Sequence, residues 1–368
     1  MTDQNFKEVV QKLKPIELAP LPACPLVSVL MANYNYARYI GEAIESVLAQ
    51  TYQQFELIVC DDGSTDDSRE EIARYIQQDP RVRLITKQNG GIASALNAAY
   101  GASQGAIFCL LDADDLFHRE KIDKVVSAFR SSGGSGVCLH RILKMYSDGR
   151  SVGCPLPVVF TEGWVGPEAL RGGGIPGNLP SRTFPEASGM SFRREVMEAL
   201  FPLPTSLRAM ADGYLCYAAQ FITAFCTLRE TLAQLRIHGQ NTNSAGEYNA
   251  EIVARNVTGL AQLLDEVRRF LAKEYGDSLA QELQAEDNSM YCSARLVLHI
   301  LRGASESPDE EATSAKWVAR IHPRRQRILA RILLFLPPPL SRRALRLWRG
   351  LSPSEAAALR VARSLLRI

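Results

Sequence analysis

Short apolar runs alternate with amphipathic segments between residues 26 and 129. The runs cover residues 26–32, 55–60, 82–86 and 106–112, and their length suits buried strands. Segments 37–50, 66–78, 91–104 and about 118–129 follow them and indicate helices; in the first, Ile40, Ile44 and Val47 share one face. This alternation predicts an α/β fold with a parallel sheet covered on both faces. Ligands of such sheets bind beyond the carboxyl ends of the strands, so the loops after residues 32, 60 and 112 are expected to carry the function.

The pattern changes after Ser131. Residues 131–136 (SSGGSG) indicate a flexible break, residues 137–146 and 231–238 indicate strands, and residues 171–182 suit a mobile loop. From Glu247 the pattern is helical, with a seam of Val253, Val257, Leu260, Leu264, Val267 and Leu271 that fits either a packed bundle or, less well, a dimer. We therefore divide the chain into an N-terminal helix and linker (1–24), two halves of an α/β domain (25–135 and 136–245) and a C-terminal helical region (246–368).

Composition excludes several classes of protein. The 368 residues are 46% hydrophobic and 22% charged, a globular mixture that is neither collagen-like nor disordered. The net charge of +2 excludes a globally basic nucleic-acid-binding protein, but residues 316–368 hold thirteen Lys and Arg against one acid, Glu355. Eight cysteines without a C-x-x-C pair indicate reduced thiols in the cytoplasm. The polar N-terminus predicts no secretory signal, and the apolar stretch 328–340 is shorter than the roughly 20 residues that span a bilayer.

Two groups of acids follow predicted strands. Asp61 and Asp62 open the sequence DDGSTD after the second strand, and residues 112–115 (DADD) follow the fourth. Turn chemistry and helix capping explain the first group equally well. The second holds three carboxylates in four residues after an apolar strand, which favours a pocket floor over a solvated turn. Clustered carboxylates of this kind suit Mg2+ or Mn2+ bound together with phosphate oxygens.

The segments VSVLMANYNYARYIGEAIESVLAQTY, ELIVCDDGSTDDS and NGGIASALNAAYGASQGAIFCLLDADD resemble, in order and spacing, three signatures of the family 2 glycosyltransferases. The resemblance runs from about Leu26 to about Ser244. It implies the GT-A fold, a Rossmann-like mixed sheet with flanking helices, here followed by the C-terminal helical region. It also implies that residues 25–135 bind a nucleotide-sugar donor, that residues 136–245 bind the acceptor, and that Mn2+ or Mg2+ is the cofactor.

The resemblance assigns roles to the donor-side residues. The backbone of Ala32 and the ring of Tyr34 are expected to contact the nucleobase, and Asp61 or Asp62 to accept a hydrogen bond from it. Asp112 resembles the acid that meets the ribose, and Asp114 the acid that holds the metal. The family often has a basic residue where this chain has Leu96, which removes one expected contact.

Three further residues come from the second half of the chain. Transfer to a hydroxyl needs a general base, and Asp212 in MADGYLCYAA resembles the family's base, although its neighbour is Ala211 where relatives have a second acid. The same Asp212 is also a suitable helix cap. His238 in LRIHGQ resembles a histidine that joins the metal or diphosphate, and Arg236 is a candidate for the phosphate oxygens. The family implies direct displacement with inversion.

The C-terminal segment carries a separate hypothesis. Leu329, Ile332 and Leu336 fall on one helical face, arginines gather on another, and Trp348 lies in LSRRALRLWRG. Basic amphipathic helices with Trp lie in anionic membrane interfaces, whereas a solvated bundle face is the alternative. The membrane hypothesis predicts a cytoplasmic enzyme that is peripheral on the inner face of the membrane. Its acceptor would be a lipid-linked saccharide or a growing surface polysaccharide.

Other functions fit less well. A sugar-phosphate nucleotidylyltransferase would need a Gly-rich basic loop after the first strand, and no glycine precedes Gly41 there. A glycoside hydrolase uses paired carboxylates but no base-binding and metal-binding acids on successive strand ends. A non-catalytic nucleotide-sugar-binding or membrane scaffold protein would keep Asp61, Asp62 and Asp112 without a functional Asp212. The oligomeric state is left open.

Overall fold

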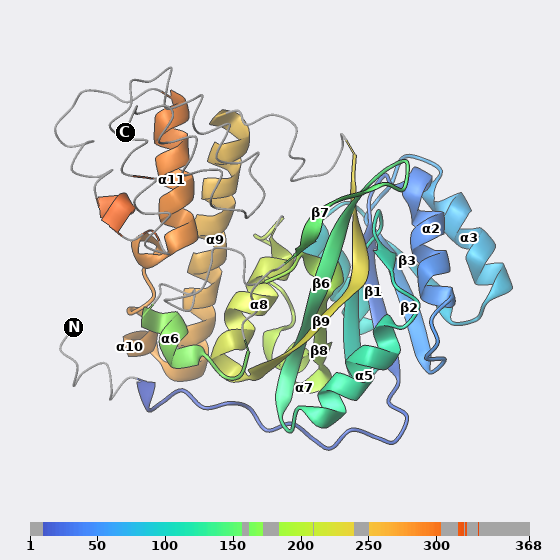
Figure 1. The fold of residues 1–368 in the computed structure, drawn as a ribbon, viewed down its shortest axis with the longest axis horizontal. Coiled ribbons are helices and arrows are strands. Elements are labelled where there is room, and N and C mark those ends of the chain that lie inside the picture. The colour runs from blue at the N-terminus through green and yellow to red at the C-terminus, as the bar shows by residue number, and fades with distance from the viewer. Residues whose placement is uncertain are drawn as a thin grey trace.

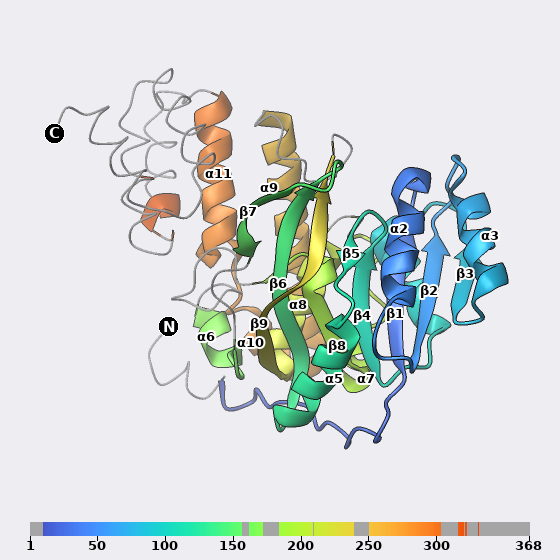
Figure 2. The same ribbon diagram turned by 45° about the vertical axis from the view of Figure 1, so that its right-hand side comes forward.

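Within the described residues, nine strands form one mixed sheet with helices on both faces, which confirms the predicted Rossmann-like α/β architecture (Figures 1 and 2). This computed structural model describes residues 10–156, 162–171, 184–208, 210–238, 250–302, 316–319, 321 and 330. The predicted mobile loop at 171–182 and the basic tail lie almost entirely outside them.

Four parallel strands form one side of the sheet, in the order β3-β2-β1-β4. They are β1 (Val27–Asn33), β2 (Phe55–Asp61), β3 (Val82–Thr86) and β4 (Ile107–Asp112). Both faces of β1 are buried: Leu30 packs on one side, and Val29 and Met31 pack on the other. This double burial explains why the strand is a nearly continuous apolar run. The strand order changes direction between β1 and β4, where sheets of this type open a crevice for ligands.

Five further strands extend the sheet: β5 (Leu116–Phe117), β6 (Ser135–Tyr146), β7 (Ser151–Leu156), β8 (Met190–Arg193) and β9 (Ala224–Ile237). β8 lies antiparallel between β4 and β6, β9 runs parallel to β6, and β5 and β7 pair antiparallel with β9 and β6. β8 therefore joins the two predicted halves into one sheet, and the boundary near residue 135 stays a prediction.

Strand pairing moves several element ends away from their predicted positions. β6 begins inside the expected break at 131–136, and β9 begins before the expected 231, because Ser135 and Ala224 lie side by side in register. The helix expected from His118 begins at Lys121, because Phe117 pairs with Ala233 in β5. Hydrogen bonds to a distant strand decided these ends, and local sequence carries little signal of them.

Helices cover the two faces of the sheet. On one face lie α2 (Ala37–Leu48), α3 (Ser68–Gln78) and α5 (Lys121–Ser131). On the other lie α4 (Ile92–Gly101), α7 (Arg194–Leu200) and α8 (Ala211–Ile222), with the short α6 (Gly166–Arg171) against α8. The amphipathic pattern of α2 follows from this arrangement, since Ile40, Ile44 and Val47 are buried against the sheet.

The C-terminal helices form a further layer beyond α8 (Figure 1). They are α9 (Ala250–Tyr275), α10 (Asp277–Ala280) and α11 (Ser289–Arg302). The apolar seam of α9 is filled within the chain: Val253 and Val257 pack in the cluster with α11, and Leu260 and Leu264 pack in the cluster with α8. The bundle interpretation of the seam therefore holds. No helix in the described part of the chain is long and apolar enough to cross a bilayer.

The N-terminal segment runs along the base of the molecule in Figure 1. The described part of the segment begins at Val10, which is helical; residues 11–12 form a turn, and residues 13–22 have no regular secondary structure. The Ile16 N–H donates to the Ile222 carbonyl oxygen at 2.7 Å, and Leu13 is buried in the α8 cluster. In the stretch predicted as a linker, the Ala19 N–H donates to Glu195 Oε1 at 2.8 Å, so this stretch is also bound to the body of the protein.

Candidate active site

The ends of β1, β2 and β4 meet at one edge of the sheet. Ala32 lies in register with Cys60 on one side and Asp112 on the other, and Asn33 lies beside Asp61. The predicted acids are therefore brought together by strand register, as their position in the sequence implied. Ala32 is half-buried in this edge, whereas the side chain of Tyr34 projects outward and is 46% exposed.

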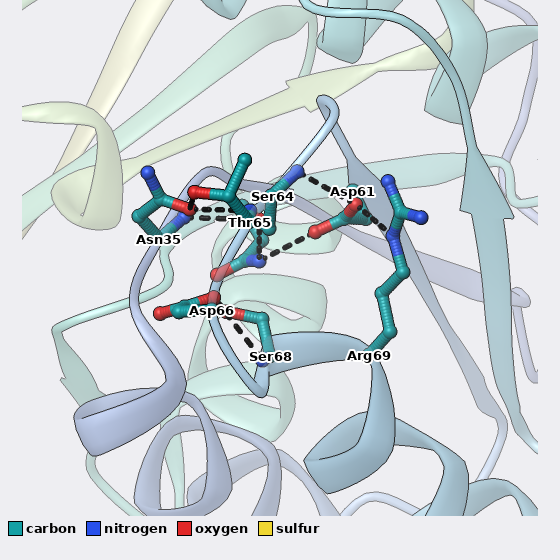
Figure 3. Close-up of polar contacts among 8 residues, drawn as sticks. Asn35, Asp61, Ser64, Thr65, Asp66, Ser68 and Arg69 are labelled. Atoms are coloured by element: carbon teal, nitrogen blue, oxygen red, sulfur yellow. Dashed lines mark hydrogen bonds and ion pairs between the residues drawn. The ribbon is translucent and has the colours of Figure 1, made fainter.

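Asp61 is fully buried and held by several donors. It accepts hydrogen bonds from Asn33 Nδ2 at 2.9 Å, from the Ser64 N–H at 3.1 Å and from Arg69 Nε at 2.7 Å. Figure 3 shows Asp61 between Ser64 and Arg69. Burial raises the pKa of Asp61, but the hydrogen bonds from Ser64, Arg69 and Asn33 outweigh it and hold the pKa below its usual value. Asp61 is therefore an ionised acceptor at neutral pH.

Asp62 fastens a different loop. Its carboxylate accepts from Lys87 Nζ at 2.6 Å and from the backbone N–H groups of Gly90, at 3.0 Å, and Gly91, at 2.7 Å. Gly63 has a φ of +84°, and a Cβ there would lie 2.8 Å from the Asn89 backbone nitrogen, so glycine is required at this close approach. Asp61 and Asp62, the acids predicted to bind the nucleobase, thus hold the loops around the site in place. A nucleobase would have to bind them alongside the donors that they already accept from.

Residues 112–115 form an acidic cluster tied to the short 3-10 helix η1 (Ala187–Gly189). Ser188 Oγ donates to Asp115 Oδ2 at 2.6 Å and accepts from the Asp112 N–H at 3.2 Å. Burial, followed by the charges of Asp115, Asp114 and Asp212, raises the pKa of Asp112 well above its usual value. Asp115 is 1% exposed, and burial, followed by the charge of Asp114, raises its pKa as well. The cluster carries more negative charge than its surroundings neutralise.

Asp114 faces the end of β9. His238 Nε2 lies 2.9 Å from Asp114 Oδ2, and both side chains are nearly buried. Arg236 Nε donates to the Asp114 carbonyl oxygen at 2.9 Å, and the Arg236 N–H donates to Asp115 Oδ1 at 2.9 Å. The structure therefore brings together the residues predicted for the metal and diphosphate, although Arg236 already binds the acidic loop.

Asp212 lies in the first turn of α8, which follows Met210 in a left-handed conformation (φ 63°). Burial raises the pKa of Asp212; hydrogen bonds from the N–H groups of Gly213 and Ala187 oppose this, and the charge of Glu186 adds to it. Because Ala187 belongs to η1, the same short helix contacts Asp212, Asp112 and Asp115. The candidate base Asp212 and the acidic cluster are thus both held by hydrogen bonds from η1.

A cavity of about 740 Å³ opens beside His238. Its described lining comes from the start of α2, the loop after β2 and the turn between β6 and β7: Asn35, Tyr36, Ala37, Arg38, Tyr39, Thr65, Asp66, Ser147 and His238. Tyr36 lines this cavity together with His238, and burial, followed by the charges of Asp114 and Asp112, raises the pKa of its hydroxyl group.

The donor set suits a hard divalent ion that is bound jointly with a substrate. Within the described ranges, no three His, Cys, Asp or Glu side chains converge into a complete metal site. Asp114 and His238 are adjacent, however, and burial together with the charges of neighbouring acids raises the pKa values of Asp112 and Asp115 well above the usual value. Mg2+ and Mn2+ are bound by one or two protein groups together with phosphate oxygens.

Sequence reasoning missed several residues of the site. Glu42 lies within the first signature but has no role there, and Ser188 and Arg69 lie outside the three signatures; only contacts across the fold reveal these residues. Asp115 belongs to the acidic run 112–115, but its sequence context gives it no separate role. Leu96, where a basic residue was expected, is 4% exposed in the core cluster, so its side chain does not reach the site.

Comparisons with known proteins give a consistent result. Residues 28–201 match the model of Glycosyl transferase family 2. An uncharacterized glycosyltransferase of Nostoc sp. is 35% identical over 286 residues, which are 76% of this chain and 87% of that protein. A chondroitin synthase of Pasteurella multocida is 40% identical over 121 residues, which are 33% of this chain but 12% of that protein.

Two solved structures align over most of the chain. A mannosyltransferase from Pyrobaculum calidifontis, in complex with GDP-Man and Mn2+, covers 86% of both chains with 20% identity and a TM-score of 0.48. TarS 1–349 of S. aureus, in complex with UDP-GlcNAc, covers 80% of this chain and 83% of its own with 17% identity and a TM-score of 0.47.

Proposed function

The chain belongs to glycosyl transferase family 2, and on this premise we propose that the acidic edge of the sheet binds a nucleotide-diphosphate sugar and transfers the sugar to a hydroxyl group. The observation that carries the proposal is the convergence of three segments: Asp112 and Asp114 at and just after the end of β4, Asp212 in the first turn of α8, and His238 after β9. Ala32, Tyr34 and the acids Asp61 and Asp62 surround the base in this proposal, and Asp112 meets the ribose.

Asp114 and His238 would hold the divalent ion, Mn2+ or Mg2+. When bound, such an ion supplies charge stabilisation for the departing diphosphate. Arg236 places a fixed positive charge next to the same acids, where it favours an anionic ligand. The residues of this side therefore bind and orient the donor, with the anomeric carbon directed toward Asp212.

Asp212 acts as the general base. It removes the proton of the acceptor hydroxyl while that oxygen forms a bond to the anomeric carbon and the bond to the diphosphate oxygen breaks. This single displacement inverts the anomeric configuration. The raised pKa of Asp212, which burial causes, brings the carboxylate closer to the operating pH and improves it as a proton acceptor.

The acceptor is proposed to be a lipid-linked saccharide or a growing surface polysaccharide. The support is the basic, Trp-containing sequence of the C-terminal tail, which predicts peripheral binding to an anionic membrane. Co-sedimentation of the full chain with anionic and neutral vesicles tests this part. We expect binding to the anionic vesicles that weakens with added salt, and equal failure with both vesicle types contradicts it.

Calorimetry tests the donor site directly. UDP, GDP, dTDP, CDP and ADP are titrated into the folded protein, each with and without Mn2+. We expect one nucleotide to bind selectively and more tightly with the metal, because its diphosphate completes the ion's ligand shell. A folded protein that binds none of the five contradicts the proposal.

A further inference from the structure

One face of α2 contacts the last residues of β9. The ring of Tyr39 stacks on the imidazole of His238, with centroids 4.6 Å apart and planes inclined by 21°. The same ring lies 5.1 Å from Arg236 Cζ. One turn further along α2, Glu42 Oε2 accepts a hydrogen bond from Arg236 Nη2 at 2.7 Å. Residues three apart lie on the same side of a helix, so Tyr39 and Glu42 form one contact surface.

These contacts reach the acidic loop through β9. Arg236 binds the Asp114 carbonyl oxygen and the Asp115 carboxylate, and His238 binds the Asp114 carboxylate. Glu42 leaves the Nε and backbone N–H of Arg236 directed at that loop, and Tyr39 covers one face of the imidazole. The ring of Tyr39 is 5% exposed, so packing fixes it.

We propose that Tyr39 and Glu42 are positioning residues that hold Arg236 and His238 in the geometry needed for a metal-bound diphosphate. The inference rests on the proposed function, since it concerns the same donor site. Groups that orient a metal ligand from behind tune the affinity for the metal without touching it. In this proposal, helix α2 from the first half of the domain orients Arg236 and His238, which come from the second half.

The chain offers matched variants for a test. Tyr39→Phe keeps the ring that contacts His238 and Arg236, whereas Tyr39→Leu removes it. Glu42→Gln weakens the ion pair with Arg236. Its control is Glu45→Gln, which removes the same charge one turn along the same helix, where Glu45 accepts from the Tyr75 hydroxyl at 2.9 Å.

The measured quantity is the gain in affinity that Mn2+ gives to the tightest-binding nucleoside diphosphate of the calorimetric panel. We expect Tyr39→Leu to reduce this gain about tenfold. Glu42→Gln should reduce it about threefold, because Glu42 is 56% exposed and solvent screens the pair. Tyr39→Phe and Glu45→Gln should keep the wild-type gain.

The outcomes separate the two proposals. If Mn2+ does not change the nucleotide affinity of the wild-type protein, the proposed metal site is wrong, and so is the positioning role. Wild-type protein that responds, together with folded Tyr39→Leu and Glu42→Gln proteins that respond equally, overturns the positioning role alone. Thermal unfolding identifies a variant that does not fold. If Tyr39→Leu does not fold, the comparison of Glu42→Gln with Glu45→Gln tests the positioning role, because Glu42 is partly exposed.

Discussion

His238 Nε2 lies 2.9 Å from Asp114 Oδ2, although 124 positions separate the two residues in the sequence. The contact joins the end of β9 to the loop after β4. In the sheet, β8 and β6 lie between these two strands. It brings an imidazole nitrogen and a carboxylate oxygen to one point, beside Asp112 and Asp115, whose pKa values are raised by burial and by neighbouring negative charges. A divalent ion bound with a diphosphate is the chemistry that this pair fits best.

Replacement of His238 by Ala removes the nitrogen ligand of the proposed metal site. We expect the Mn2+-dependent gain in nucleotide affinity to fall by at least about tenfold, whereas the metal-free affinity stays near that of the wild type. Calorimetry with and without Mn2+ measures both. His118→Ala changes an exposed histidine and is the control. An unchanged metal response in His238→Ala would falsify the assignment of this ligand.

Asp212→Asn keeps the shape of the side chain and removes its ability to accept a proton. We expect the turnover number to fall by roughly 10²- to 10⁴-fold, the range typical for the loss of a general base. The nucleotide affinity should stay within about twofold of the wild type, because Asp212 contacts the acceptor in the proposed mechanism. Steady-state kinetics and calorimetry measure the two effects; a variant that turns over at the wild-type rate rules out Asp212 as the base.

Gly63→Ala places a methyl group against the Asn89 backbone in the loop that Asp62 fastens. Gly133→Ala is a matched control, since Gly133 also has a positive φ (+63°) but has open space where the Cβ would lie. Both variants carry the conformational cost of a side chain at positive φ, about 1 kcal/mol. We expect Gly63→Ala to lose more stability in urea unfolding and to weaken nucleotide binding, and Gly133→Ala to bind normally. Equal behaviour of the two would show that the close approach is unimportant.

We expect the free energy of unfolding to depend on pH because of Lys121. Its Nζ donates to the Ser188 carbonyl oxygen at 3.0 Å and lies 3.4 Å from the centre of the Phe117 ring, and burial lowers the pKa of Lys121 to about 8. Between pH 8 and about 10 the unfolded chain binds a proton that the folded chain does not, so the free energy of unfolding rises with pH.

The Lys121→Met variant isolates this effect. We expect the difference in unfolding free energy between wild type and variant to grow in favour of the wild type by up to about 1.4 kcal/mol per pH unit in this window. Below pH 8 the difference should be constant. Urea unfolding at several pH values measures it, and parallel pH profiles would show that Lys121 titrates normally.

The sequence determined where the acids of the proposed donor site lie. The apolar runs before Asp61 and Asp112 identified strands that are buried on both faces, and acids directly after such strands must gather at one edge of a parallel sheet. Local rules suffice here, because strand length, turn residues and chain direction fix where these side chains lie. Resemblance to a family then made Asp212 and His238 candidates, and Arg236 was a candidate because of its guanidinium group and its place beside His238.

Only the tertiary structure decided how these residues are supported. Nothing in the local sequence places Ser188 between Asp112 and Asp115, or Tyr39 and Glu42 behind Arg236 and His238. Such contacts join segments far apart in the chain, so they depend on strand register and helix packing, not on local propensity. The same holds for the N-terminal segment and for the ends of β6 and β9, since their hydrogen-bond partners lie in distant parts of the sequence.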